Sequence, residues 1–367
     1  MAKPFIILFV FLFLAPLFIH ADAQSRGPSE EEERSTSSSI TKPSGELETT
    51  SASDIKPMNR GSSTFNEAWV YHIYLDDGTQ LYLSYMLANF GTFMSPVGGG
   101  RLSVINFDGE YYQVARQYDI DQMKYSEQDY KLRLHPEREI WFEGKLPENH
   151  RVRYKTEKDG VAYDIDLTFD EIHAGYRWGD GFFEADGEEI GIQMHIPQAK
   201  VSGKVKINDE SKQVTGTAYM DHTYQSTITP RVLSSGYRYI NHDTENWQIG
   251  YFLLPKETRE HTDIVGYSLK KQPDGVKLKK PSTIRLSDNT DFKGGRVPEN
   301  LSVDFNPSGS SSVTVKEGFE RLSFLSEVSG LRKRIARRYL GGEIIEYRGV
   351  GQLDDGNRAY LNYFQVE

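Results

Sequence analysis

Apolar and polar residues alternate with a period of two over most of this chain, beginning near Phe65. A period of two places successive side chains on opposite faces of a β-strand, whereas a helix needs a period near 3.6. Residues 68–75 and 80–87 show this pattern on either side of Asp76, Asp77 and Gly78. Asp-Gly is typical of tight hairpin turns. The chain is therefore predicted to be all-β and antiparallel.

Further alternating segments follow at a spacing of about ten residues, which is typical of sandwiches and barrels. They cover residues 101–107, 110–118, 130–134, 139–143, 151–155, 161–169, 191–197, 199–208 and 213–222. Nine or ten strands are enough to close a barrel, since about eight already surround a small ligand. We therefore predict a first barrel over residues 63–226.

The stretch Gly216 to Ser226 (GTAYMDHTYQS) ends this first run of strands and precedes a second one. The second run covers residues 236–241, 246–255, 262–270, 302–305, 312–318, 342–353 and 358–367. Asp354 to Asn357 is its last predicted hairpin turn. A second barrel of similar size is predicted over residues 227–367.

Residues 325–340 break the strand pattern, because their apolar residues recur near helical spacing and Gly341 and Gly342 provide a helix stop. Basic residues fill other positions, among them Arg332, Lys333 and Arg337. One interpretation is a solvated helix that covers a barrel end. The other is contact between these basic residues and an anionic membrane surface.

The N-terminus has the pattern of an export signal. Lys3 precedes an apolar run from Phe5 to Ile19, and Ala21, Asp22 and Ala23 form an A-x-A cleavage site. A membrane-spanning helix usually needs about 20 apolar residues, more than this run holds. Residues 1–23 are therefore predicted to be removed, which makes the protein secreted or periplasmic. Residues 24–62 are rich in Ser, Thr, Glu and Pro, and we predict a disordered linker there.

The amino-acid composition excludes several kinds of functional site. The chain has no cysteine, so disulfides, thiolate metal sites and cysteine nucleophiles are excluded. Its net charge of -10 argues against a nucleic-acid partner. The histidines show neither H-x-x-x-H nor H-E-x-x-H spacing, and no G-x-S-x-G is present. We predict no metal site and no cofactor.

Asp221 and His222 are adjacent, so on a strand they face opposite sides of the sheet. His222 then shares its face with Met220 and Tyr224, while Tyr219 lies on the face of Asp221. Two interpretations stay open: an inward His222 beside Tyr224 exchanges protons with a substrate, or Asp221 and His222 hold the junction of the two barrels by hydrogen bonds.

Aromatic residues are frequent, with 22 tyrosines and 19 phenylalanines. Cross-strand packing in a β-core explains many of them. An aromatic-lined cavity for an extended apolar ligand is the second explanation. Because alternate residues face opposite sides, both can hold.

Three blocks resemble the tandem-lipocalin superfamily: Glu67 to Gly78 (EAWVYHIYLDDG), Pro197 to Gly203 (PQAKVSG) and Gly216 to His222 (GTAYMDH). This superfamily contains the carotenoid 1,2-hydratase family, related terpenoid cyclases and Diels-Alderases, and the survival-factor family of fungal ceramide carriers. The resemblance covers about residues 65–367. It implies two lipocalin-like barrels in series, with an apolar ligand bound near their junction.

The resemblance also shows departures from the hydratases. The residue two positions after the motif histidine is usually Trp in that family and is Tyr224 here. Hydratase chemistry is thought to need a carboxylic acid on a later strand, and residues 247–254 (WQIGYFLL) contain none. Residues 224–241 instead resemble the survival-factor branch, which is associated with sphingolipid transfer and oxidative-stress survival.

Our leading hypothesis from the sequence is therefore an exported protein that binds or carries a lipid or isoprenoid. Its ligand-binding candidates are Trp69, Tyr219, Tyr224, Trp247 and Tyr251. The alternative is a hydratase, isomerase or cyclase of a terpenoid or carotenoid-like substrate, with Asp221, His222 and Tyr224 as catalytic candidates. A carboxylate turned into the cavity would indicate this enzyme. A structural protein, with both barrels filled by their own side chains, is the third possibility.

Overall fold

The computed structural model describes residues 40–58, 62–93, 95–241, 246–256, 262–326 and 330–367. The predicted export signal and residues 24–39 of the predicted linker lie outside these ranges. In the described ranges, no helix combines the length and the apolar character needed to cross a membrane.

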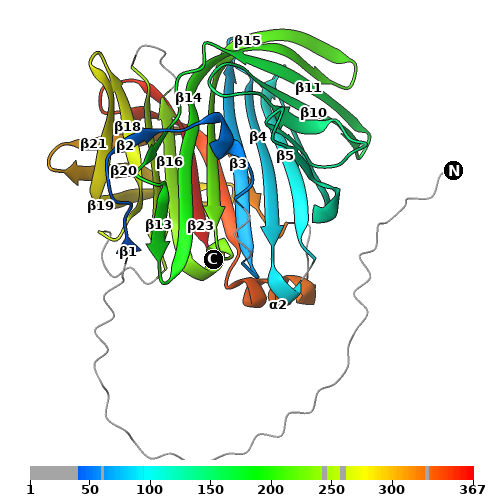
Figure 1. Ribbon diagram of the computed structural model, residues 1–367. Coiled ribbons are helices and arrows are strands. Elements are labelled where there is room, and N and C mark those ends of the chain that lie inside the picture. The colour runs from blue at the N-terminus through cyan, green and yellow to red at the C-terminus, as the bar shows by residue number, and fades with distance from the viewer. Residues whose placement is uncertain (1–39, 59–61, 94, 242–245, 257–261, 327–329) are drawn as a thin grey trace, which may run out of the picture. The chain divides into compact units, whose positions relative to one another are not determined.

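Residues 40–225 form one large antiparallel sheet of 15 strands, here called sheet A (Figure 1). Its main hydrogen-bonded path runs β6-β5-β4-β3-β15-β14-β11-β10-β9-β8-β7, and β1, β2, β12 and β13 pair beside it. The strands are β1 (Ile40–Thr41), β2 (Leu47–Thr49), β3 (Phe65–Leu75), β4 (Gln80–Asn89), β5 (Val97–Phe107), β6 (Glu110–Asp119), β7 (Lys124–Ser126), β8 (Lys131–Arg133), β9 (Ile140–Glu143), β10 (His150–Lys158), β11 (Val161–Asp170), β12 (Tyr176–Trp178), β13 (Phe182–Ala185), β14 (Glu188–Ile207) and β15 (Glu210–Gln225).

Sheet A curls around its own core without closing a hydrogen-bonded ring in the described part of the chain. The Tyr154 hydroxyl on β10 donates to the carbonyl of Gly100 on β5 at 2.9 Å, across the interior. Tyr85 on β4 donates to the carbonyl of Trp141 on β9 at 2.8 Å. The predicted first barrel is therefore a strongly curled open sheet. Hydrogen bonds from large side chains, rather than strand pairing, connect strands on opposite sides of its interior. Local alternation in the sequence does not reveal such contacts.

Residues 233–366 form a closed barrel of eight antiparallel strands, here called barrel B. The second predicted barrel is thus confirmed. Its strands are β16 (Leu233–Asn241), β17 (Gln248–Pro255), β18 (Val265–Gln272), β19 (Gly275–Phe292), β20 (Gly295–Asn306), β21 (Ser310–Ser323), β22 (Ile344–Leu353) and β23 (Arg358–Val366). Sequence analysis missed β19, because its lysines and Pro281 hide the alternation. Apolar side chains such as Phe252, Val303 and Leu361 pack together inside this barrel.

Helices are few and short. They are η1 (Ala52–Ile55), η2 (Gly91–Phe93), η3 (Ile120–Gln122), α1 (Thr229–Val232) and α2 (Gly330–Leu340). The α2 helix confirms the one helix predicted from apolar spacing. Its buried residues Ala336 and Leu340 pack with Ile228 and Leu325, and Phe90 lies against the same cluster. Figure 1 shows α2 beside the end of β4.

The segment before β3, here called the N-terminal arm (residues 40–58), is ordered where a disordered linker was predicted. β1 pairs with β13, and β2 pairs with β12. Ile55 in η1 is fully buried. The polar composition of residues 24–62 hides these few anchoring residues, and the edges of β12 and β13 that receive them come from more than 100 residues further on.

Strand β15 separates two hydrophobic cores. Met220 and Tyr224 belong to the core inside sheet A, whereas Tyr219 belongs to a second core between sheet A and the outside of barrel B. Barrel B contributes Tyr251, Tyr267 and Val350 to that second core. The predicted alternation along the motif is therefore confirmed.

Candidate active site

The pairing of β3 with β15 places Glu67 against His222 inside sheet A. Trp69 lies opposite His222 in the register, and Glu67 lies opposite Tyr224. The Nε2 atom of His222 is 2.7 Å from the Oε1 atom of Glu67, and both side chains are fully buried. A buried carboxylate and an imidazole at hydrogen-bond distance can share and transfer a proton.

The N-terminal arm holds this pair from one side. The backbone N–H of Met58 donates to Oε1 of Glu67 at 2.6 Å. The indole of Trp69 donates to the carbonyl of Ile55 at 2.8 Å. The Trp69 ring stacks on His222 with centroids 4.4 Å apart and planes at 19°. The imidazole therefore has a fixed plane, and the carboxylate oxygen that contacts it is also fixed.

A second imidazole lies beside His222. The rings of His195 and His222 have centroids 5.7 Å apart and planes at 28°. Burial, together with the neighbouring His222, holds the pKa of His195 well below its usual range. His195 is therefore neutral and offers one donor and one acceptor at neutral pH.

Several polar atoms around this pair have no hydrogen-bond partner among the described residues, although they are buried. They are Oε2 of Glu67, Oε1 of Gln193, both ring nitrogens of His195 and Nδ1 of His222. Buried polar groups nearly always have a partner in native proteins, so a cluster like this one needs an explanation. A polar group of a bound molecule, or ordered water, is the usual one.

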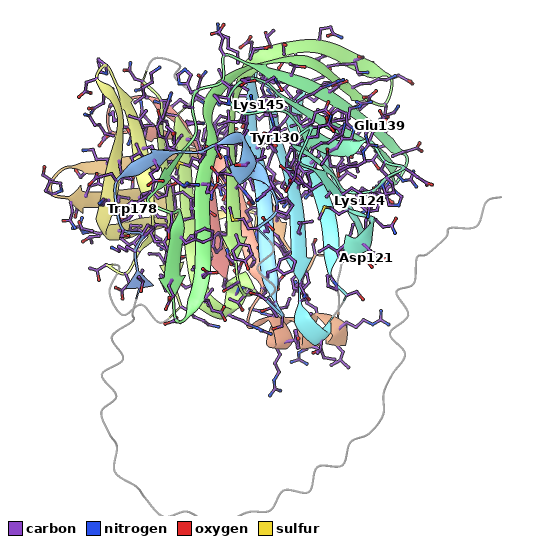
Figure 2. All side chains as sticks on the ribbon, in the orientation of Figure 1. Asp121, Lys124, Tyr130, Glu139, Lys145 and Trp178 are labelled. Carbon is purple, nitrogen blue, oxygen red and sulfur yellow. The ribbon has the colours of Figure 1, made fainter. Side chains whose placement is uncertain are left out.

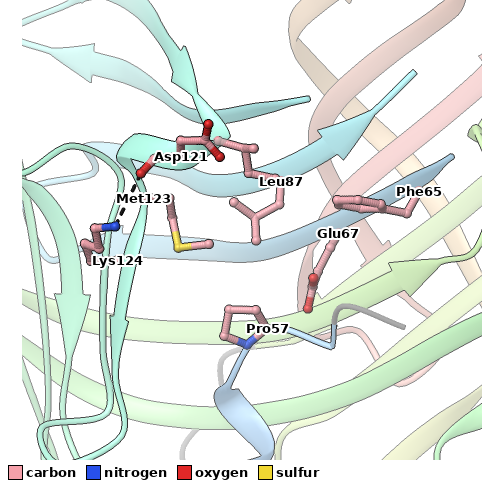
Figure 3. Close-up of a pocket in the computed structure, with 8 residues that line it drawn as sticks. Pro57, Phe65, Glu67, Leu87, Asp121, Met123 and Lys124 are labelled. Carbon is pink, nitrogen blue, oxygen red and sulfur yellow. Dashed lines mark hydrogen bonds between the residues drawn. The ribbon is translucent and has the colours of Figure 1, made fainter. Parts of the chain in front are cut away.

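A cavity of about 560 Å³ opens against Glu67 (Figure 3). Its lining is largely apolar, with one buried carboxylate and a charged edge, and consists of Pro57, Phe65, Glu67, Leu87, Ile120, Asp121, Met123 and Lys124. Figure 3 shows Phe65 and Glu67 side by side on β3, with Pro57 of the N-terminal arm across from them. Cavities of this size and character bind small, mostly apolar molecules.

The edge of the cavity is formed by η3 and β7. Lys124 donates to the backbone carbonyl of Asp121 at 3.4 Å. Figure 2 shows Asp121 and Lys124 close together at one side of sheet A, far across the view from Trp178. Both side chains are exposed. The opening of the cavity is therefore polar, whereas Glu67 lies on the inner side of the cavity.

The opposite face of β15 holds Asp221, which the sequence grouped with His222. Oδ1 of Asp221 is 3.3 Å from Nη2 of Arg238 on β16, and both residues are buried. Arg238 also lies over the ring of Tyr251, 4.1 Å from its centroid. Asp221 therefore joins sheet A to barrel B, whereas His222, which the second interpretation placed at the same junction, lies inside sheet A.

The sequence-predicted site residues separate into two groups. His222, Tyr224 and Trp69 lie inside sheet A with Glu67. Asp221, Tyr219, Tyr251 and Trp247 lie on the other side of β15, in the core between sheet A and barrel B. Trp247 donates its indole N–H to Nδ1 of His173 at 2.8 Å. The structure thus does not bring all the candidates into one pocket.

Sequence reasoning missed Glu67, although a signal was available. Phe65, Glu67, Trp69, Tyr71 and Ile73 share one face of β3, and all are buried. A carboxylate in an otherwise apolar inward series is costly unless it is paired. This pattern marks Glu67 as a residue with a partner, but its identity depends on a strand 155 residues away.

Across the described ranges, no cluster of three or more His, Asp or Glu side chains is arranged to hold a metal ion. The basic residues proposed for membrane contact lie on α2, and two of them have partners within the protein. Lys333 pairs with Glu343 at 2.6 Å, and Nε of Arg337 donates to the backbone oxygen of Glu367 at 3.0 Å. Arg332 is exposed.

Solved structures with the same fold have low sequence identity to this chain. A candidate ATTH protein of Nitrosomonas europaea matches with a TM-score of 0.59 and 13% identity, over 86% of this chain and 96% of that one. CghA with Sch210972 matches with a TM-score of 0.57 and 10% identity, over 83% and 89%. Kievitone hydratase from Nectria haematococca matches with a TM-score of 0.50 and 13% identity, over 89% and 97%.

No protein-family model matches the chain, and no curated protein matches it either. At these identities the structural likeness establishes the fold alone. At that level it agrees with the resemblance drawn from the sequence: the chain has the fold of these three proteins.

Proposed function

We propose that this protein is an enzyme that adds water to, isomerises or cyclises a small hydrophobic molecule by proton transfer. The observation that carries the proposal is the buried Glu67–His222 pair, with 2.7 Å between its oxygen and nitrogen, whose Glu67 lines a largely apolar cavity. Proton transfer from a positioned side chain accelerates such reactions by about 10² to 10⁴-fold.

The pair can complete a hydration without any other group. In its neutral form one proton is shared between Oε1 of Glu67 and Nε2 of His222. Transfer of a proton from the Glu67 carboxyl to an alkene carbon leaves a carbocation and a carboxylate. Water then bonds to the cation, and its surplus proton returns to Glu67. The product gains one H and one OH, and the pair returns to its starting state.

Isomerisation and cyclisation use the same first step. After protonation, loss of a proton from a neighbouring carbon moves the double bond. Attack by a second double bond of the same molecule closes a ring and leaves a new carbocation, which loses a proton to the Glu67 carboxylate and restores the acid. The apolar wall formed by Phe65, Leu87 and Met123 suits a hydrocarbon skeleton.

This proposal reverses the order of our two sequence-based hypotheses. A carrier was preferred because residues 247–254 contain no carboxylate, but β3 supplies one. A passive carrier of an apolar ligand has no need of a buried acid-base pair, whose burial is costly. The name of one structural neighbour, kievitone hydratase, supports the same choice.

The test is a turnover assay with alkene-bearing terpenoids and polyketides in ¹⁸O-labelled water, followed by mass spectrometry. A hydratase product gains 20 mass units, whereas isomers and rings keep the substrate mass. Glu67→Gln keeps the shape and removes the transferable proton. We expect kcat/KM to fall by about 10² to 10⁴-fold.

Two comparisons make this test decisive. Asp221→Asn changes the other buried carboxylate of the motif region, and Glu139→Gln is a neutral control at a half-exposed ion pair with Lys155. Loss of turnover in Asp221→Asn with full turnover in Glu67→Gln would contradict the proposal. Release of only unchanged lipid from protein purified from its own host, with no turnover, would return the preference to the carrier.

A further inference from the structure

The exposed face of α2 carries apolar side chains that nothing in the described chain covers. Leu331 is 71% exposed, Ile335 is 54% exposed, and Phe324, shortly before the helix, is 52% exposed. Only one other large hydrophobic residue in the described ranges, Tyr111, is exposed to a similar degree. Three exposed apolar residues at one helix mark an interaction surface.

The helix places these residues opposite its buried side. At about 100° per residue, Leu331 and Ile335 are neighbours one turn apart, while Ala336 and Leu340 lie on the far side and are buried. Arg334 and Arg338 flank the apolar pair on one side, and Arg332 flanks it on the other. All three arginines are exposed. An apolar ridge between cations is the pattern of a helix that lies in a membrane interface.

Charge complementarity identifies the occupant of this surface. The whole chain carries a net charge of -10, yet α2 contains five basic residues and no acidic one. Lys333 and Arg337 have partners within the protein, as described above. Among the described residues, none forms an ion pair with Arg332, Arg334 or Arg338, so these three exposed cations can meet an external anion.

We propose that the exposed face of α2 docks on the surface of an anionic lipid bilayer. Leu331, Ile335 and Phe324 enter the level of the head groups, and the three exposed arginines contact lipid phosphates and carboxylates. An anionic bilayer offers an apolar interior directly beneath a dense layer of negative charge, which matches an apolar ridge flanked by arginines.

The position of α2 links this docking to the cavity. The Tyr339 hydroxyl donates to the carbonyl of Phe90 at 3.0 Å and lies 3.2 Å from Oγ1 of Thr92. These residues follow β4 directly, and Leu87 near the end of β4 lines the cavity. If the proposed function holds, docking brings the cavity to the source of an apolar substrate. The docking itself does not depend on that function.

The absence of cysteine allows a site-specific test in the full chain. Ile335→Cys carries one environment-sensitive NBD dye on α2, and Ser287→Cys carries the same dye at an exposed position of β19. Vesicles of phosphatidylcholine, with and without 30% phosphatidylserine (a chosen composition, roughly that of an anionic leaflet), are then added. We expect a blue shift only at residue 335 and only with the anionic vesicles.

A second measurement separates charge from apolar contact. Each basic residue near an anionic surface strengthens partitioning by about five-fold. The variant Arg332→Gln/Arg334→Gln/Arg338→Gln should therefore bind anionic vesicles on the order of 100-fold more weakly. Lys145→Gln/Lys200→Gln/Lys277→Gln removes the same number of charges elsewhere and should bind as the parent protein does.

Three results would overturn the proposal. One is no shift at residue 335, or an equal shift at residue 287. Another is equal binding by the two triple variants. The third is a shift at residue 335 that grows with protein concentration before vesicles are added, since this would show that a second copy covers α2. Because none of these measurements uses turnover, their failure is distinct from failure of the proposed function.

Discussion

Two further buried histidines, His150 and His195, lie near the proposed catalytic pair. Nε2 of His150 is 2.9 Å from the hydroxyl of Tyr71. Burial alone lowers the pKa of His150 from 6.5 to about 3. Burial and the nearby His222 lower the pKa of His195 in the same direction. Both rings are therefore neutral in the folded protein over the range in which the unfolded chain becomes protonated.

The difference in pKa between the folded and the unfolded chain predicts a loss of stability below pH 6.5. The folded pKa of His150 is depressed, so its contribution is complete above the unfolded value and is lost as the pH falls from 6.5 towards about 3. The free energy of unfolding should fall by about 1.4 kcal/mol for each pH unit in this window. From pH 7 to pH 5, His150 alone should remove about 2 kcal/mol.

Urea unfolding at pH 7, 6 and 5 measures this loss. His150→Gln removes the titrating ring and should reduce the difference between pH 7 and pH 5 by about 2 kcal/mol. His135→Gln, at a half-buried surface position, is the matched control. An identical pH dependence in His150→Gln and the parent protein would rule out this role for His150.

At the scale of an element, β15 needs close contact with β3 on one side. A Cβ atom added at Gly216 would lie 2.1 Å from the carbonyl oxygen of Tyr74 and 2.8 Å from Cα of Leu75. Both contacts are with backbone atoms, which cannot move away by a change of side-chain rotamer. The first glycine of the GTAYMDH block is therefore required for the strand pairing that brings Glu67 to His222.

Gly216→Ala should push β15 away from β3 at Gly216, where the pairing of the two strands begins. Crowding of this kind costs roughly 1–3 kcal/mol. Thr217→Ala, one position further on the same strand, is the control and should cost less. Chemical denaturation gives both values, and a loss in Gly216→Ala no larger than in the control would show that β3 moves freely to accept the added methyl group.

The elements also show what the sequence can reveal. Alternation predicted that Asp221 and His222 face opposite sides of β15, and the Asp-Gly turn located the hairpin of β3 and β4. The same rules could not find Glu67 as the partner of His222, because strand pairing over 155 residues is decided by the whole fold. They also missed β19 and the ordered N-terminal arm, whose apolar anchors are too few to stand out in composition.

At the scale of the whole molecule, buried ions join sheet A to barrel B. Glu320 on β21 accepts from Arg101 on β5 at 2.9 Å, and Arg348 on β22 pairs with both Glu320 and Glu346. Burial raises the pKa of Glu320, but Arg348 and Arg101 outweigh it, so the pKa is lowered overall. With the Arg238–Asp221 pair, this network makes the two parts one cooperative unit.

Removing one residue of the Arg238–Asp221 pair should therefore lower the free energy of unfolding. Arg238→Met leaves Asp221 buried without its cation, and such losses cost about 3–5 kcal/mol. Arg238→Met/Asp221→Leu removes both charges of the pair, and most of that loss should be recovered. Arg151→Met, at an exposed ion pair with Asp166, should cost at most about 1 kcal/mol.

Urea unfolding followed by circular dichroism gives the three values. The same curves report cooperativity, since the parent protein should unfold in one transition. If the double variant is no more stable than Arg238→Met alone, the cost does not arise from an unpaired charge, and the explanation given for this junction is wrong.

Because of the N-terminal arm, the residue at which an expressed protein begins affects the candidate active site. Composition places that start near residue 63, and a gene trimmed there would still encode every strand of barrel B as well as β3 and β15. Its product would lack the Pro57 wall, the Met58 N–H that holds Glu67 and the Ile55 carbonyl that holds Trp69.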